Sequence, residues 1–211
     1  MAEGNYRGRP EPDSETTEEQ RELLVAAFAK AAAEQGYAKL EVEQVLRYAG
    51  VSRATFDAHF RSMEQGLIAA QDAFFDRIWW DVIAACGGSG EWPLKVRDAI
   101  GAVLASVGEA SSLARVFAIE ATAASLAAAE RQFAALDRFA TLLRDGRTIY
   151  PAAATLPAVT ERALVGGIAS ILSGHLLVEE PRAISALESQ LVELLLIPYL
   201  GEAEARLVAA A

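Results

Sequence analysis

One short stretch, Ala49-Gly50-Val51-Ser52, constrains this chain more than any other part of it. Three apolar residues precede it at helical spacing and so share one helix face: Val42, Val45 and Leu46. Gly50 can adopt a positive φ and end that helix, and Ser52 is a suitable N-cap for a second one. Phe56 and Phe60 then give the second helix an apolar face. The pattern predicts a helix-turn-helix, two short helices joined by a tight turn.

A wider set of residues around this turn resembles the DNA-binding domain of the tetracycline-repressor (TetR) family. The matching residues lie between about 20 and 68: Phe28, Gly36-Tyr37, Val42, Val45, Ala49-Gly50-Val51-Ser52, Thr55-Phe56, His59-Phe60, Glu64 and Leu67. Elsewhere only the helical layout and a closing Pro198-Tyr199-Leu200-Gly201 are similar to the family. The resemblance implies a ligand-responsive transcriptional regulator. The alternative for the stretch itself is a three-helix core that makes no contact with DNA.

The second helix of a helix-turn-helix enters the major groove, where its N-terminal residues meet base edges. We therefore expect DNA contacts from this helix and the residues that follow it: Ser52, Arg53, Ala54, Thr55, Asp57, His59, Arg61 and Ser62. Arg53 is the first candidate for base recognition, because a guanidinium pairs bidentately with guanine. Thr55, His59, Ser62 and the first amides of the helix are candidates for phosphate contacts.

Three positions depart from the family pattern. Asp57 stands where a neutral aromatic residue is usual, Met63 where a lysine is usual, and Leu40-Glu41 where a threonine is usual. Each lost phosphate contact should lower DNA affinity and flatten its salt dependence. Asp57 either accepts a hydrogen bond from cytosine N4 or handicaps binding by repelling phosphates, and both interpretations stay open.

Composition limits the remaining classes of function. The 211 residues carry a net charge of −10, which argues against non-specific nucleic-acid binding by the whole molecule. Cys86 is the single cysteine, which excludes an internal disulfide framework and a cysteine-rich zinc site. The polar N-terminus has no signal-peptide core, and no uninterrupted apolar run is long enough to cross a bilayer. The expectation is a soluble, cytoplasmic protein with no membrane partner.

The rest of the chain has the pattern of helices rich in alanine and leucine, without the alternation of strands. We predict an all-α fold of about nine helices, with single helices at residues 112–124 and 126–143 and a last long helix at residues 183–196. Residues 1–15 should form a disordered arm, residues 16–62 a three-helix DNA-binding domain, and residues 63–211 a ligand-binding and dimerisation domain. Residues 144–158, which contain two prolines, are expected to form a loop.

Two later helices carry a possible dimer interface. Small residues in the penultimate helix allow close helix approach, and leucines line the last one. In the TetR family two such helices from each chain form a four-helix bundle, so the resemblance implies these interface residues: Gly167, Ser170, Gly174, Leu187, Leu191 and Leu194. Tight packing within one chain is the alternative.

Large aromatic residues opposite small alanines leave room for a ligand cavity in the body. The candidate ligand contacts are Phe74, Trp79, Phe117, Glu120 and Phe133, with an ordinary core as the alternative. Enzyme chemistry has little support, because the two histidines, His59 and His175, lie in different regions with no carboxylate or cysteine cluster. We expect no metal and no cofactor.

Together these patterns predict a homodimeric regulator, a repressor, that binds palindromic operator DNA and is released by a small, largely apolar effector. The alternative is a dimeric module that binds a small molecule or a protein and whose DNA binding is lost or altered.

Overall fold

The structure is a computed structural model of one chain, and it describes residues 14–88, 90–178 and 181–211. These residues form twelve α-helices with short 3-10 and π segments between them, and they include no β-strand. The predicted all-α fold is confirmed. Residues 1–13 of the predicted arm lie outside the described residues, whereas residues 14 and 15 belong to the first helix.

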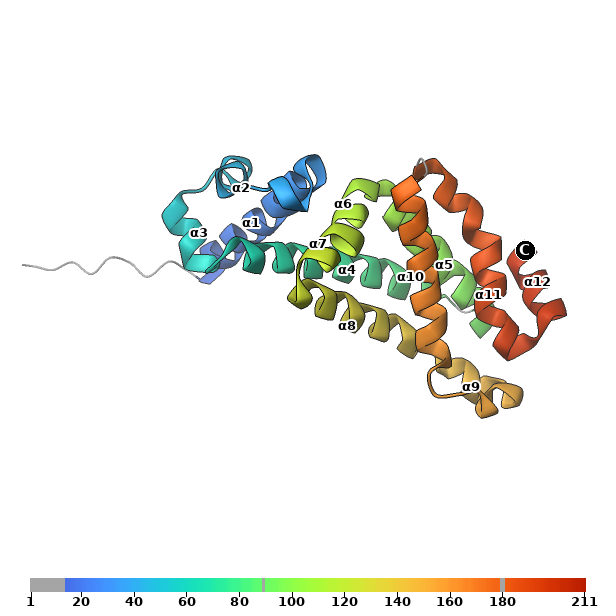
Figure 1. The fold of residues 1–211 in the computed structure, drawn as a ribbon. Helices are drawn as coiled ribbons and strands as arrows, with labels where there is room; N and C mark the ends of the chain where they lie inside the picture. The colour runs from blue at the N-terminus through green and yellow to red at the C-terminus, as the bar shows by residue number, and fades with distance from the viewer. Residues whose placement is uncertain (1–13, 89, 179–180) are drawn as a thin grey trace, which may run out of the picture.

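The N-terminal helices form a small unit at one end of the molecule, which we call the head (residues 14–60; Figure 1). Its elements are α1 (Ser14–Gln35), the 3-10 turn η1 (Tyr37–Lys39), α2 (Val42–Ala49) and α3 (Arg53–His59). Gly36 ends α1 with φ 77°, and Gly50 ends α2 with φ 66°, both in the left-handed region that favours glycine. The turn predicted at Gly50 is therefore confirmed.

Three phenylalanine rings form the centre of the head. Phe28 of α1 lies 5.9 Å from Phe56 and 5.7 Å from Phe60, and the last two rings are 6.0 Å apart. All three side chains are buried, as is Val45 of α2. Tilted and edge-on rings at these distances attract one another and fix the angles between the helices.

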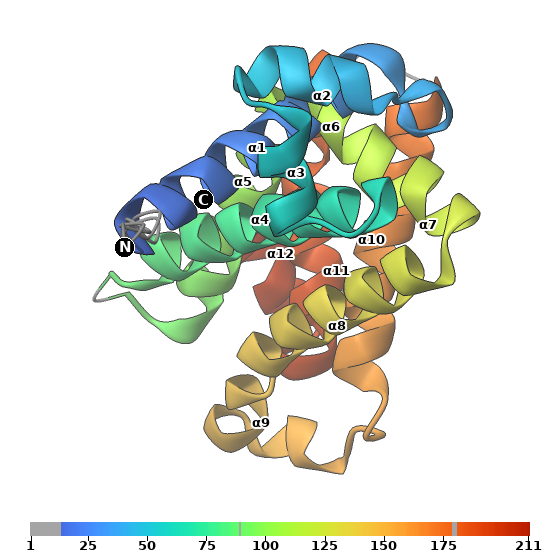
Figure 2. The ribbon, with the colours of Figure 1, turned by 90° about the vertical axis from the view of Figure 1, so that its left-hand side faces the viewer.

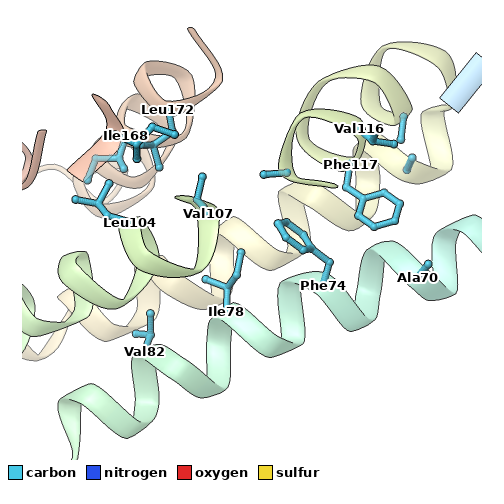
Figure 3. Packing of buried hydrophobic residues seen from close by; sticks show 14 of the residues in the cluster. Ala70, Phe74, Ile78, Val82, Leu104, Val107, Val116, Phe117, Ile168 and Leu172 are labelled. Atoms are coloured by element: carbon cyan, nitrogen blue, oxygen red, sulfur yellow. The ribbon is translucent and has the colours of Figure 1, made fainter. Parts of the chain in front are cut away.

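Helix α4 (Met63–Cys86) leaves the head and runs along the rest of the molecule, which we call the body (residues 63–211; Figure 1). Ala70, Phe74, Ile78 and Val82 repeat at four-residue spacing on one of its faces and are buried. Figure 3 shows them pointing toward the buried side chains of the neighbouring helices. This face of α4 is therefore one wall of the body's core.

The other body helices pack around α4 in several layers (Figures 1 and 2). In chain order the elements are α5 (Trp92–Glu109), α6 (Ser111–Arg115), the π-helix η2 (Val116–Glu120), α7 (Ala121–Ala124), α8 (Leu126–Leu143), α9 (Asp145–Ile149), η3 (Pro151–Thr155), α10 (Thr160–Val178), η4 (Pro181–Leu187), α11 (Glu188–Leu200) and α12 (Glu202–Ala210). Most predicted helices are present, and α8 begins and ends where the sequence predicted.

Four details differ from the sequence prediction. The single helix expected from 112 to 124 is continuous but contains a π-helical turn, η2. The short helix α9 and the turn η3 occupy the region expected to be a loop. The last long helix was expected to span 183–196; α11 instead continues past Pro198, which lies in its final turns, to a cap at Gly201, and α12 follows. Pro198 has no N–H to donate to the carbonyl oxygen of Leu194, four residues earlier, so α11 lacks one helical hydrogen bond at that point.

A charged cluster holds the segment between α8 and α10 to the body. Arg147 Nη2 lies 2.9 Å from Glu161 Oε2, and the guanidinium also donates to the carbonyl oxygens of Leu156 and Pro157 at 2.7 Å. The Tyr199 hydroxyl donates to Glu161 Oε1 at 3.1 Å. These hydrogen bonds, first the one from Arg147, hold the pKa of the buried Glu161 carboxyl below its usual range.

Helix α10 is the one helix within the described ranges that is long and apolar enough by itself to cross a membrane, and only 17% of that apolar window is buried. Helix α5 and the α6–α7 segment meet the same test only as a span bent by 96°. Because the α10 window includes the charged residues Glu161 and Arg162, it is not an uninterrupted apolar run, and the sequence expectation is not contradicted. A helix with an exposed apolar face is also typical of proteins in which another protein surface covers that face.

Candidate functional site

The second helix of the helix-turn-helix, α3, is fixed by its N-cap and by its buried face. Ser52 Oγ accepts the Thr55 backbone N–H at 3.1 Å, as predicted for a cap, and lies 2.9 Å from Thr55 Oγ1. Phe56 packs into the ring cluster on one side. The opposite face, with Arg53, Ala54 and Asp57, is exposed to solvent at the end of the molecule (Figure 1).

All eight predicted DNA contacts lie on α3 or just outside its ends. Ser52, Arg53, Ala54, Asp57, Arg61 and Ser62 are exposed, whereas Thr55 and His59 are half-buried. Ser62 is the N-cap of α4, because its Oγ accepts the Gln65 backbone N–H at 3.2 Å. Its hydroxyl proton is not used in that hydrogen bond and remains available for an acceptor such as phosphate.

The Arg53 guanidinium is held by Asp57, one helical turn further along α3. Arg53 Nε donates to Asp57 Oδ1 at 2.9 Å, and the guanidinium carbon lies 5.5 Å from the centre of the Phe56 ring. Both side chains are more than half exposed. Because this hydrogen bond uses Nε, it leaves the two terminal nitrogens of Arg53 unused. Two guanidinium nitrogens can pair bidentately with guanine.

Glu41, one of the departures from the family pattern, has a structural position in the head. It is the N-cap residue of α2, and its backbone N–H donates to Gln44 Oε1 at 3.4 Å. A carboxylate at a helix N-terminus also interacts favourably with the helix dipole. Met63, a second departure, is the half-buried first residue of α4.

The body contains a cavity of about 210 Å³ with mainly apolar walls. Residues of α4, α5, α6, η2, α8, α9, α10 and α11 line it, including the rings of Phe74, Phe75, Trp92 and Phe139. Its polar lining residues are Cys86, Lys95, Gln132, Asp145 and Ser173. The Cys86 thiol donates to the Lys95 carbonyl oxygen at 3.6 Å, and burial raises the pKa of this thiol. Such a site favours a ligand with an apolar body.

Of the five predicted ligand contacts, only Phe74 lines this cavity. Phe117 is fully buried against the Phe74 ring, at 5.8 Å, and belongs to the core (Figure 3). Trp79 packs on Phe139 and under the Arg138 guanidinium. Phe133 is 66% exposed, because its position on α8 faces away from the body. These three residues do not line the cavity, and their role as ligand contacts stays a prediction.

Glu120, the fifth predicted contact, lies at the junction between body and head. Its Oε2 accepts the Tyr37 backbone N–H at 2.9 Å, and Arg115 Nε lies 3.8 Å from Oε1. The carboxylate points toward the turn between α1 and η1 and not into the cavity. Glu120 therefore does not line the cavity, and its role as a ligand contact stays a prediction.

Comparison with known proteins identifies the head. Residues 24–70 match the family model of bacterial regulatory proteins, tetR family. The head and the start of α4 are therefore similar to the regulators of that family. No curated protein sequence matches the chain. The description of that family names regulatory proteins, and the matched residues include the helix-turn-helix formed by α2 and α3.

Solved structures of TetR-family and related regulators share the fold of the whole chain. The fatty acid degradation regulator FadR from Bacillus halodurans is 16% identical, with a TM-score of 0.72 over 91% of this chain and 97% of that one. FadR from Bacillus subtilis in complex with stearoyl-CoA is 16% identical, with a TM-score of 0.66 over 85% and 98%. RolR in complex with resorcinol is 17% identical, with a TM-score of 0.67 over 94% and 96%.

The six residues predicted for the TetR-type dimer interface lie on α10, at the end of η4 and on α11. Ser170, Gly174 and Leu194 are exposed, Gly167 and Leu187 are half-buried, and Leu191 is buried within the chain. A Cβ added at Gly167 or Gly174 would have no heavy atom within 4 Å. The α10 glycines therefore do not serve close packing inside the described chain.

Two polar links between α4 and the segment from η2 to α8 were missed from sequence. Gln71 of α4 is 1% exposed, and its Nε2 donates to the carbonyl oxygens of Phe117 and Ala128 at 3.1 and 3.2 Å. Ser125 Oγ donates to Glu64 Oε1 at 2.6 Å. The role of Gln71 could have been predicted from its position between Leu67 and Phe74 on the apolar face of α4, because a buried polar residue needs a hydrogen-bond partner.

Proposed function

We propose that this chain is a homodimeric, ligand-responsive transcriptional repressor of the TetR family. It binds palindromic operator DNA through α3 of each head and leaves the DNA when a small, largely apolar effector enters the body. One observation supports this proposal: the Arg53 side chain is more than half exposed at one end of a chain whose body holds an apolar cavity. Residues 16–62 then act as the DNA-binding domain and residues 63–211 as the domain for ligand and partner chain.

A dimer through α10 and α11 is supported by the exposure of their apolar residues. Leu177 and Val178 of α10 and Leu194 of α11 are exposed, and the glycines of α10 have open space beside them. A second copy that packs α10 and α11 against the same helices would cover this face in a four-helix bundle. We propose that the apolar surface of α10 contacts the partner chain and does not cross a membrane. A two-fold dimer also matches the symmetry of a palindromic operator.

An effector with an apolar body is supported by the walls of the cavity. The two structurally similar regulators named as complexes hold stearoyl-CoA and resorcinol, one with a long chain and one with a single small ring. The structural similarity to these two regulators therefore supports a response to a ligand, but it does not indicate which chemical class of ligand binds. Trp92 lines the cavity, whereas Trp80 is largely exposed. Binding of an apolar probe such as anilinonaphthalene sulfonate should change the fluorescence of Trp92, so Trp92→Phe should remove the change and Trp80→Phe should keep it.

The DNA-binding half of the proposal is tested with a labelled fragment from the region upstream of the protein's own gene. We expect a sequence-specific shift at low salt that weakens as salt rises. Arg53→Ala should lower specific affinity roughly 10- to 100-fold, the range for one bidentate contact with guanine. Arg206→Ala, on α12 in the body, should leave affinity unchanged. Absence of any shift at low salt, with the protein folded and dimeric, would contradict the proposal.

A second candidate function is a dimeric module for small molecules or proteins that has lost or altered DNA binding. The Arg53–Asp57 ion pair and the net charge of −10 favour it, because both weaken attraction to phosphates. The same shift assay decides between the two. The module predicts effector binding by the cavity and no DNA complex at any salt concentration.

A further inference from the structure

We infer that Glu120 is a positioning residue that fixes the DNA-binding head on the body and relays the state of the cavity to it. This inference rests on the proposed DNA-binding function. It concerns one hydrogen bond, from the Tyr37 backbone N–H to Glu120 Oε2 at 2.9 Å, which joins residues 83 positions apart.

The backbone around Gly36 is shaped to receive this carboxylate. Gly36 has φ 77°, and a Cβ added there would lie 2.9 Å from Glu120 Oε2. A side chain at position 36 would therefore meet both an unfavourable backbone conformation and the carboxylate itself. Glu120 thus lies directly against the turn that ends α1 and leads, through η1, to the helix-turn-helix.

Glu120 is the last residue of the π-helix η2, and buried hydrogen bonds stabilise that helix. The Phe117 carbonyl oxygen accepts from Gln71 Nε2 at 3.1 Å and from Thr122 Oγ1 at 3.2 Å. Because π-helical turns have fewer favourable contacts than α-helical ones, they persist where side chains such as these satisfy them. The amide of Gln71 therefore holds η2, and with it Glu120, in a defined position relative to α4.

The same π-helix forms part of the cavity wall. Ala118, two residues before Glu120, lines the cavity, and so does Phe74, whose ring packs on Phe117 (Figure 3). At the other end of the segment, Ser125 Oγ donates to Glu64 near the start of α4. The segment 116–125 thus lines the cavity at Ala118, contacts the head at Glu120 and contacts the start of α4 at Ser125. A ligand that displaces Ala118 displaces the acceptor of the Tyr37 amide.

Hydrogen exchange of the Tyr37 amide measures this link without DNA and without the natural effector. Glu120→Ala removes the acceptor and should speed exchange at Tyr37 by roughly tenfold or more, as expected for loss of a hydrogen bond to a charged group. Glu120→Gln keeps an acceptor oxygen and should retain most of the protection. Glu130→Ala, on the exposed surface of α8, is the matched control and should change nothing at Tyr37.

A larger side chain in the cavity wall takes the place of the ligand in the second measurement. Ala118→Leu, on η2, should speed exchange at Tyr37 and lower affinity for the upstream DNA fragment at least threefold. Ala169→Leu also adds volume at the cavity, but from α10, and should affect both quantities less. In a Glu120→Ala background, Ala118→Leu should have no further effect on DNA affinity, because the relay is already broken.

The outcomes separate this inference from the proposed function. Unchanged exchange at Tyr37 in Glu120→Ala, with DNA binding intact in the unaltered protein, overturns the relay alone. Equal effects of Ala118→Leu and Ala169→Leu, or an additive effect of Ala118→Leu in the Glu120→Ala background, also overturn it. Absence of DNA binding by the unaltered protein, with Tyr37 protected by Glu120, leaves the junction in place and overturns the proposed function.

Discussion

Aromatic residues pack closely in the head, whereas in the body they leave a cavity. In the head, Phe28, Phe56 and Phe60 lie within 6.0 Å of one another, and Gly66 of α4 closes the space beside them. In the body, aromatic rings and alanines leave a cavity of about 210 Å³. A close-packed unit resists deformation, whereas a unit with a void has more than one way to fill it. The head is therefore suited to move as a rigid piece, and the body to change shape around a ligand.

The largest expected effect tests the rigidity of the head. In Gly66→Ala the new Cβ would lie 2.0 Å from Phe28 Cε2, so the ring cluster must separate. We expect destabilisation of about 3 kcal/mol, the upper range for overpacking, and loss of DNA binding, measured by thermal unfolding and by gel shift. Gly108→Ala, where an added Cβ has no heavy atom within 4 Å, should instead be neutral or slightly stabilising. Equal melting temperatures for the two variants would show that the head is not close-packed.

The next prediction concerns a part of the body that is held by several hydrogen bonds, the Arg147–Glu161–Tyr199 cluster. Because the folded-state pKa of Glu161 is lowered, its contribution is present above the ordinary carboxyl pKa of about 4.3 and is lost as pH falls through the folded-state value. Glu161→Gln should lower the melting temperature at pH 7 by about 5–10 °C. The difference between the variant and the unaltered protein should shrink on acidification below about pH 4. A difference that stays constant down to pH 3 would contradict this assignment.

The third prediction tests whether the exposed face of the body is a dimer interface. Gly174→Phe adds a large side chain where the chain itself has open space, so the fold of each protomer should survive. Overpacking at the bundle should raise the dissociation constant at least tenfold and give monomers at micromolar concentration, measured by light scattering. Ala134→Phe, on the exposed surface of α8, should remain dimeric. Monomeric unaltered protein would refute the interface.

The smallest expected effect concerns the DNA-contacting edge of the head. Asp57→Asn removes the charge of Asp57 and weakens its hold on Arg53 while keeping the shape of the side chain. If Asp57 positions Arg53, selection among random DNA sequences should show a weaker guanine preference at one position, by a few-fold. A lost cytosine preference would instead assign cytosine recognition to Asp57, and uniformly tighter binding would make it a handicap. An unchanged selection profile would contradict all three roles.

The head could be predicted in detail because its signals are local. The φ requirement at Gly50 and the cap at Ser52 each act within a few residues, and both are present in the structure. Phe56 and Phe60 lie on a short helix whose buried face the i, i+4 spacing already indicates. Once the buried face of α3 is known, the residues on its other face are expected to be exposed.

The body could be predicted as helices but not as a site. Its cavity is lined from helices that are far apart in sequence, so Trp92 and Phe139 contribute while Phe133, of the same residue type, faces solvent. Glu120 shows the same limit. A carboxylate among apolar residues signals a partner, but the partner is a backbone amide 83 positions away, which no spacing rule identifies.

The position of Cys86 has a practical consequence. It is the one cysteine of the sequence, it lines the cavity, and burial raises the pKa of its thiol. Since the thiolate is the reactive form, alkylation at neutral pH should be slow, and a bound molecule that covers the sulfur should slow it further. The rate of Cys86 alkylation in the unaltered protein thus reports whether the cavity is occupied. Candidate effectors can be ranked by how well they protect Cys86 from a small alkylating reagent, without engineered labels and before any operator is known.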